Sequence, residues 1–334
     1  MARTAESLEG TRVGAYELGK LLGAGGMGHV YRATAVGKGA STRAVAVKVL
    51  DADLARDRKA VARFEREADA VRRLDHPNVI RILEVGTVRG RPYLAMELVS
   101  GPSFRRLIDD HGEPARVIAI LAQVADGLAH AHARGIVHRD IKPDNVLVDR
   151  SDHAWIADFG LARVADTASL SSTGQVLGTA KYMSPEQARG QKVSAASDVY
   201  SLGVMLYEAI TGDVPFASET QHGFIFKHVA EAPPRPALHP GYPPPLARLA
   251  LECLHKDPAA RPNMSEVAER LHAALAWRAP PRRGRWLLAA SLLAIGALWL
   301  AFPYALDPLT DGWIGAPVAR ALRDGALAVR AALP

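Results

Sequence analysis

The segment GAGGMGHV, residues 23–30, has the composition of a loop that holds phosphate groups. The glycines at 23, 25 and 28 carry no side chain, so backbone amides there can approach phosphate oxygens closely. A dinucleotide-binding fold would need the third glycine to open a helix, whereas this chain continues as HVYRAT, which is typical of a strand. The segment therefore predicts a turn between two strands. Taken alone, it fits a glycine-rich hairpin without a ligand equally well.

Further charged and polar motifs follow along the chain. They are Lys48 in VAVK, Glu67 in RFEREAD, HRDIKPDN at 138–145, DFG at 158–160 and GTAKYMSPE at 178–186. In residue type, order and spacing, the glycine-rich segment and these motifs resemble the eukaryotic-type protein kinases over about Tyr16 to Ala274. The sequence SPEQARG and an apolar run near the C-terminus are most similar to those of bacterial signalling kinases.

The resemblance implies a serine/threonine protein kinase, which moves the γ-phosphate of ATP to protein hydroxyls in signal transduction. Such a transfer depends on positioning and on neutralising charge. By resemblance, Asp140 and Lys142 are catalytic: Asp140 would orient the attacking hydroxyl and accept its proton, and Lys142 would steady the γ-phosphate. Asn145 and Asp158 would bind Mg²⁺, with Mn²⁺ as the alternative metal. Lys142 and Thr179 also resemble the serine/threonine branch rather than the tyrosine-specific one.

The resemblance also implies a nucleotide site in which Lys48 holds the α and β phosphates. Glu67 would aim the Lys48 ammonium, and Glu65, on the same expected helix, is the competing carboxylate. Met96 would lie behind the adenine, and backbone groups from Glu97 to Val99 would bind its edge. For each apolar wall residue, plain core packing is the alternative. The complete set expected to bind ATP is Leu22, Gly23, Ala24, Gly25, Gly26, Met27, Gly28, His29, Val30, Ala46, Lys48, Glu67, Met96, Glu97, Val99 and Leu147.

Arg139 is expected to regulate the enzyme. In kinases with an arginine before the catalytic aspartate, that arginine commonly meets a phosphate on the activation segment, here residues 158–186. A phosphoryl group adds nearly two negative charges, which a guanidinium can hold. We hypothesise autophosphorylation at Ser171 or Thr173, with a homodimer that allows it in trans. A plain polar loop is the alternative.

Structural contacts beneath the catalytic residues are implied as well. The expected contacts are an ion pair between Glu186 and Arg261, an anchor for the catalytic loop at Asp198, and packing of His138 on Phe159. Buried ion pairs of this kind are costly to break. His130, His132 and His138 lack cysteine or carboxylate partners at zinc spacing, which disfavours a structural zinc site.

These residues would be positioned by an α+β, two-lobed protein kinase fold at residues 15–275. Alternating apolar segments predict a small, mostly antiparallel β lobe at 15–99, with one helix in the charged stretch 57–74. From 100 to 275 the spacing becomes helical, most clearly in VIAILAQVADGLAHAHARG and DVYSLGVMLYEAITG. Each of these two segments ends at a glycine, which is a typical helix stop.

The composition fits a chain with a sizeable core, because 49% of its 334 residues are hydrophobic. A net charge of +6 suits nucleic acid, anionic lipid or a phosphorylated ligand, so charge alone selects none of them. The motifs make ATP and protein substrates the expected partners, and no nucleic acid is expected. The single cysteine, Cys253, allows no intramolecular disulfide and predicts a buried position in a helix. Residues 1–14 predict a flexible lead without a secretory signal.

The uncharged run WLLAASLLAIGALWLAFPYAL, residues 286–306, predicts a single C-terminal transmembrane helix, because about 20 apolar residues span a bilayer core. A basic juxtamembrane linker precedes it at 276–285. Since basic residues beside a span tend to stay in the cytoplasm, we expect a single-pass protein in the cell (inner) membrane with a cytoplasmic kinase domain. A buried core helix is the alternative. Residues 307–334 would form a short extracytoplasmic tail, too small for an independently folded sensor.

Two other functions are compatible with parts of the sequence. A catalytically inactive kinase fold that acts as a scaffold would usually lack Lys48, Asp140 or Asp158, and all three are present. A small-molecule kinase, such as an aminoglycoside phosphotransferase, generally lacks a segment like GTAKYMSPE. The identity of the protein substrate depends on surface charge and co-localisation, which one sequence does not reveal.

Overall fold

The computed structural model describes residues 7–25, 28–37, 43–159 and 180–277. The chain divides into two units, Met1–Trp277 and Arg278–Pro334, and all described residues belong to the first. Within the described ranges, none of the helices has both the length and the apolar character that a membrane crossing needs. The run at 286–306, where we predict a transmembrane helix, lies outside these ranges.

The first lobe is built on a six-stranded antiparallel sheet with the strand order β1-β2-β3-β4-β6-β5. Its strands are β1 (Arg12–Val13), β2 (Tyr16–Gly25), β3 (Gly28–Ala35), β4 (Val45–Leu50), β5 (Ile82–Val88) and β6 (Arg91–Glu97). Because β4 lies inside the sheet, all 6 of its residues are buried. The register places Lys48 of β4 opposite Val30 of β3 and Leu94 of β6. Lys48 is therefore held by strands on both sides.

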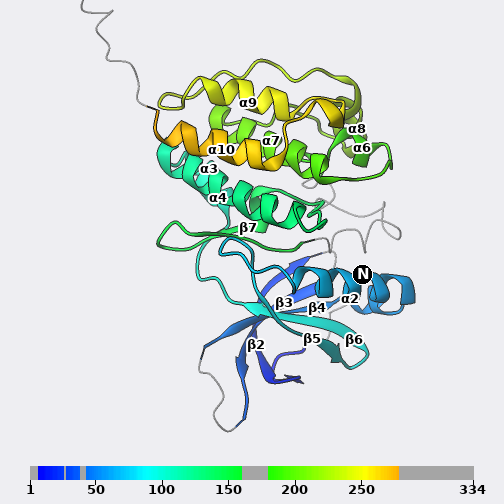
Figure 1. Ribbon diagram of the computed structural model, residues 1–334. Helices are drawn as coiled ribbons and strands as arrows, with labels where there is room; N and C mark the ends of the chain where they lie inside the picture. Colours follow the sequence, from blue (N-terminus) through cyan, green and yellow to red (C-terminus); the bar gives the residue numbers. More distant parts are fainter. Residues whose placement is uncertain (1–6, 26–27, 38–42, 160–179, 278–334) are drawn as a thin grey trace, which may run out of the picture. The chain divides into compact units, whose positions relative to one another are not determined.

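Helix α2 (Arg58–Val71) lies against this sheet (Figure 1), and the short helix α1 (Ala52–Ala55) precedes it. The buried side chains recur every three or four residues, at Ala60, Phe64, Ala68 and Val71. Phe64 packs in one cluster with Leu94 and Met96 of β6. The charged stretch 57–74 thus contains the helix that the sequence predicts.

The N-terminal segment does not follow the prediction of a flexible lead at 1–14. From residue 7 onward it packs on the outer face of the sheet, and β1 pairs with β2. Leu8 and Val13 are 2% and 1% exposed and share a cluster with Val47. Burying one such aliphatic side chain is worth about 1.5–3 kcal/mol, which is enough to hold a short segment in place.

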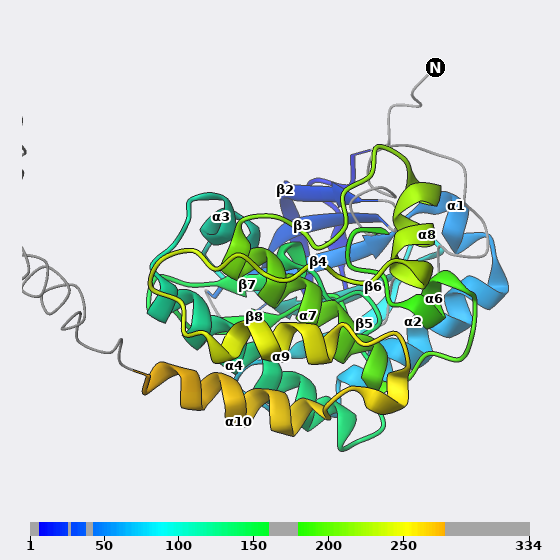
Figure 2. The same ribbon diagram turned by 90° about the horizontal axis from the view of Figure 1, so that it is seen from above.

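Over its described residues, 100–159 and 180–277, the second lobe is mainly helical and carries one small hairpin. Its helices and strands are α3 (Phe104–Asp109), α4 (Pro114–His132), η1 (Pro143–Asn145), β7 (Val146–Val148), β8 (Ala154–Ile156), α6 (Pro185–Ala188), α7 (Ala195–Thr211), α8 (Gln221–Ala230), α9 (Pro245–Cys253), η3 (Pro258–Ala260) and α10 (Met264–Leu275). Every residue of α7 from Ser197 to Ile210 is buried, because α4, α9 and α10 pack around it (Figure 2). Gly212, with a φ of 86°, ends α7 in the left-handed conformation that glycine favours. The two-lobed α+β arrangement is confirmed for the described residues.

Candidate active site

A buried carboxylate anchors the loop that leads to Asp140. Asp198, in the first turn of α7, is fully buried. Its Oδ1 accepts from Arg139 N at 2.7 Å, its Oδ2 accepts from His138 N at 2.8 Å, and His132 Nε2 lies 2.7 Å from Oδ2. These contacts replace the water that a buried carboxylate loses. The predicted anchor at Asp198 is confirmed, and His132 is a partner that no motif indicated.

The ring of His138 fixes the same loop. It is fully buried, its Nε2 lies 2.9 Å from Ala157 O, and its Nδ1 accepts from Asp140 N at 3.2 Å. Burial lowers the pKa of His138, so the ring is neutral, with a proton on Nε2 and an acceptor at Nδ1. The ring also packs on Phe159, with centroids 4.5 Å apart, as predicted.

The carboxylate of Asp140 is held by two of the residues that the sequence places beside it. Lys142 Nζ donates to Asp140 Oδ2 at 2.8 Å, and Asn145 Nδ2 donates to the same oxygen at 3.0 Å. Asn145 Nδ2 also donates to the main-chain O of Asp140 at 2.7 Å. Because the Asn145 amide nitrogen faces Asp140, its amide oxygen is the atom suited to a cation. Ala157 N donates to Asn145 O at 2.8 Å, which brings Asn145 beside the strand that leads to Asp158.

Lys48 and Asp158 connect the two lobes. Lys48 Nζ donates to Asp158 Oδ1 at 2.7 Å, and the two side chains are 8% and 35% exposed. Burial alone would raise the pKa of the Asp158 carboxyl, but the Lys48 ammonium outweighs that effect and lowers it. Asp158 is therefore ionised at neutral pH, as an oxygen ligand for a divalent cation must be.

Glu67 has a different partner from the one predicted. We expected Glu67 to pair with Lys48, but its Oε1 lies 3.1 Å from Arg139 Nη1, and no ion pair joins it to Lys48 among the contacts of the described residues. The competing carboxylate, Glu65, is exposed. The physical reason is that Asp158 already neutralises the lysine, while Arg139 offers Glu67 a second cation. Arg139 was expected to hold a phosphate, and in this structure it holds a carboxylate.

The glycine-rich turn joins β2 to β3 as predicted, and its glycines differ in what they allow. A Cβ added at Gly28, where φ is 145°, would lie 2.0 Å from Val49 O, so only glycine fits there. A Cβ at Gly23 or Gly25 would meet no atom within 4 Å. The space beside these two glycines is open, which suits phosphate groups. Residues 26–27 lie outside the described ranges.

The residues expected to surround an adenine ring form one apolar cluster. Its members from the predicted set are Val30, Ala46, Met96, Val99 and Leu147. Leu22 is 49% exposed, and Ala24 lies opposite His29 across the β2–β3 pair. The N–H of Glu97 donates to Arg81 O at 3.1 Å, so this group is already bonded within the protein and does not serve a base. Of the backbone set at 97–99, the carbonyl of Glu97 and the groups after it are the ones suited to that role.

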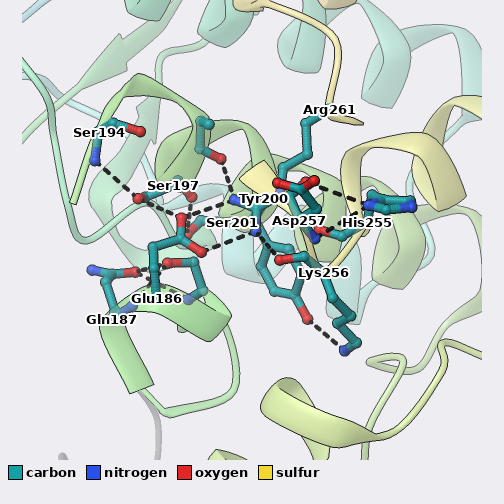
Figure 3. A network of polar contacts seen from close by, with 12 residues as sticks. Glu186, Gln187, Ser194, Ser197, Tyr200, Ser201, His255, Lys256, Asp257 and Arg261 are labelled. Carbon is teal, nitrogen blue, oxygen red and sulfur yellow. Dashed lines mark hydrogen bonds and ion pairs between the residues drawn. The ribbon is translucent and has the colours of Figure 1, made fainter. Parts of the chain in front are cut away.

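An ion pair beneath the site connects α6 to the C-terminal part of the lobe (Figure 3). Arg261 Nη1 and Nη2 donate to the two carboxylate oxygens of Glu186 at 2.8 and 2.9 Å, and the side chains are 0% and 4% exposed. Ser197 Oγ adds a hydrogen bond to Glu186 Oε1 at 2.6 Å. The predicted buried pair is confirmed.

The residues just before α6 are tied to α7 and α8 by contacts that no motif indicated. Ser201 Oγ donates to Tyr182 O at 2.8 Å. His228 is fully buried, with Nε2 3.0 Å from Lys181 O and Nδ1 2.9 Å from the Tyr200 hydroxyl. Burial lowers the pKa of His228 to about 4, so the ring is neutral at physiological pH and its Nε2–H donates to the carbonyl. Such long-range side-chain contacts are visible only once the fold is known.

Part of the predicted site lies outside the described residues. Ser171, Thr173 and Thr179 belong to this part, as do the glycine and methionine at 26–27. Autophosphorylation at Ser171 or Thr173 therefore stays a prediction.

Within the described residues, the arrangement has the parts that phosphoryl transfer needs. A lysine ammonium, the oxygens of Asn145 and Asp158, and the Asp140 carboxylate with Lys142 beside it converge from both lobes. The lysine ammonium can neutralise phosphate charge directly, and the Asn145 and Asp158 oxygens could do so through a divalent cation that they would bind. The Asp140 carboxylate can accept a proton from a hydroxyl.

Residues 16–272 match the family model described as the protein kinase domain. Over 266 residues the chain is 40% identical to the serine/threonine-protein kinase pkn3 of Myxococcus xanthus. This alignment covers 75% of this chain and 48% of that protein. The chain is 42% identical over 255 residues to the serine/threonine-protein kinase PknB of Mycobacterium tuberculosis. That alignment covers 74% of this chain and 40% of the relative. The chain thus spans less than half the length of these curated relatives.

Solved structures support the same fold. The crystal structure of the Mycobacterium tuberculosis PknI kinase domain superposes with a TM-score of 0.60 at 28% sequence identity, covering 80% of this chain and 98% of that one.

Proposed function

Because this chain belongs to the protein kinase domain family, we propose that it transfers the γ-phosphate of ATP to serine or threonine hydroxyls of protein substrates in signalling. The observation that carries the proposal is the Lys48–Asp158 contact across the lobes, which lies beside the Asp140, Lys142 and Asn145 group. The Myxococcus and Mycobacterium relatives are both named serine/threonine kinases, which supports serine and threonine as the residues that accept the phosphate.

In the proposed reaction, each residue has one task. Asp140 orients the attacking hydroxyl and accepts its proton, and Lys142 stabilises charge on the moving phosphoryl group. Lys48 binds the α and β phosphates of the nucleotide. Asn145 and Asp158 would hold a divalent cation, for which we propose Mg²⁺; when bound, it would neutralise charge on the phosphates.

Transfer of labelled phosphate from ATP to a generic acceptor protein tests the proposal. We expect label on phosphoserine and phosphothreonine. Lys48→Met should lower kcat/KM for ATP about 10- to 100-fold, because a hydrogen bond from a charged group is worth about 1.5–3 kcal/mol and each 1.36 kcal/mol is tenfold. Wild-type protein that leaves the acceptor unlabelled, or labels only tyrosine, would refute the proposal.

The same reaction tests activation. We propose that the protein phosphorylates itself at Ser171 or Thr173, in trans within a homodimer, and that Arg139 receives the phosphate. Mass spectrometry of the chain after incubation with ATP would place the phosphate, and phosphate found only elsewhere would remove this part of the proposal.

We also propose that residues 286–306 anchor the protein in the cell (inner) membrane, with the kinase domain in the cytoplasm. The support is the length of the uncharged run and the arginines that precede it. The full chain should pellet with membranes and resist alkaline extraction, whereas the double variant Leu293→Arg and Leu298→Arg should shift to the soluble fraction. A wild-type chain found in the soluble fraction would contradict the anchor.

A further inference from the structure

The side chain of Gln187 links α6 to the catalytic loop. Its Oε1 accepts from Ser184 N and from Ser184 Oγ, both at 3.0 Å. The first of these bonds, with Gln187 N donating to Ser184 Oγ at 3.4 Å, forms the capping box at the start of α6. Its Nε2 donates to the main-chain O of Arg139 at 2.7 Å, across a sequence separation of 48 residues. One amide group therefore has a local contact and a distant contact, made by its two different atoms.

The distant contact holds the carbonyl end of a peptide group in the catalytic loop. Arg139 has a φ of 72°, in the left-handed region that side chains disfavour, so its surroundings must hold it there. The peptide between Arg139 and Asp140 is bonded at both ends, because its O accepts from Gln187 and its N–H donates to His138 Nδ1 at 3.2 Å. The preceding peptide is held by Asp198, which accepts from Arg139 N at 2.7 Å.

We propose that Gln187 is a positioning residue for phosphoryl transfer, since it sets the peptide plane from which the Asp140 carboxylate projects. This inference rests on the proposed kinase function. Rotation of that peptide would move Asp140 relative to Lys142 and Asn145, which hold its carboxylate. Misplacement of a catalytic group by about 1 Å can cost about 10²-fold in rate.

A purely local role, in which Gln187 only caps α6, is the competing possibility. The two roles use different atoms, so they can be separated. A glutamate at this position would keep the acceptor that the capping box needs and would lose the donor to Arg139 O. A lysine would keep a donor and lose the acceptor.

The experiment compares Gln187→Glu and Gln187→Lys in the full chain by steady-state phosphotransfer. We expect Gln187→Glu to lower kcat about 10- to 100-fold with KM for ATP within about twofold of wild type, and Gln187→Lys to retain more of kcat. Gln191→Glu, an exposed change of the same charge four residues away, is the matched control and should leave kcat within about twofold. If the kcat of Gln187→Glu, which keeps the acceptor, equals or exceeds the kcat of Gln187→Lys, which keeps a donor, the inference is overturned.

A pH series adds a readout that damage to the fold would not produce. A protonated carboxyl carries one O–H donor, which can bond to Arg139 O again. The kcat ratio of Gln187→Glu to wild type should therefore rise as pH falls toward the pKa of the introduced carboxyl, and a ratio that stays constant with pH would count against a positioning role. If the wild-type protein transfers no phosphate, the proposed function fails. If the wild-type protein and both variants are equally active, the proposed function stands and only the positioning role of Gln187 fails.

Discussion

Replacing Asp140 with asparagine is expected to lower kcat for phosphoryl transfer by a factor of about 10²–10⁴, the usual contribution of a positioned proton acceptor. The structure indicates why the substitution should slow the chemical step without changing the shape of the catalytic loop. Lys142 Nζ and Asn145 Nδ2 both donate to Asp140 Oδ2, and an asparagine oxygen at that place can accept the same two hydrogen bonds. The loop should therefore keep its shape, while the group that takes the hydroxyl proton is lost.

The measurement is kcat from labelled ATP, together with nucleotide affinity from a titration that needs no turnover. Affinity for the nucleotide should stay within about twofold, because Asp140 acts on the acceptor hydroxyl. Asp144→Asn is the matched control, since Asp144 is an exposed carboxylate of the same loop. A fully active Asp140→Asn protein would show that another group accepts the proton.

Replacing Arg261 with alanine is expected to lower the free energy of unfolding by about 3–5 kcal/mol, the cost of leaving one member of a buried ion pair without its partner. Glu186 would then keep a buried carboxylate with no cation. Arg261 also donates from Nε to His255 O at 2.8 Å and from Nη1 to Ala196 O at 2.7 Å, so its loss leaves carbonyl groups without donors as well. Urea unfolding followed by circular dichroism measures the change.

The control for this prediction is Arg248→Ala. Arg248 also pairs with a glutamate, Glu252, at 2.7 Å, but its side chain is 82% exposed, so its removal should cost at most about 1 kcal/mol. The pH dependence gives a second check. Burial raises the pKa of Glu186, but Arg261 and Ser197 outweigh it and lower the pKa, so the pair contributes its stability at neutral pH and loses it as Glu186 is protonated in acid. The difference between wild type and Arg261→Ala should therefore shrink at low pH, and a difference that is small at neutral pH would contradict the prediction.

The groups that carry charge in the site could be predicted from the sequence because each belongs to a motif with a fixed chemical task. Lys48, Asp140 and Asp158 lie together as the motifs required, and the pair of Glu186 with Arg261 is buried as expected. Residue type alone did not assign these roles. The resemblance of the motifs to those of a known family supplied both the roles and the pairing of Glu186 with Arg261.

Choices between partners could not be predicted in the same way. Two cations, Lys48 and Arg139, were open to Glu67, and Glu67 pairs with Arg139 while Asp158 neutralises Lys48. Residue type does not decide between these partners, because the fold brings them together from separate segments. The contact of Gln187 with Arg139 joins segments that are distant in sequence, so no local pattern contains it. Leu8 and Val13 were missed because two isolated apolar residues in a polar stretch show no periodicity.

The packing of Leu8 and Val13 bears on how the catalytic part of this protein is produced by itself. The family match begins at residue 16, and an expression fragment cut at that boundary would lack both side chains and would expose aliphatic surface around Val47 to water. Such a fragment would be prone to aggregation for a reason unrelated to catalysis. Recombinant versions intended for crystals or inhibitor screening should therefore start upstream of Leu8.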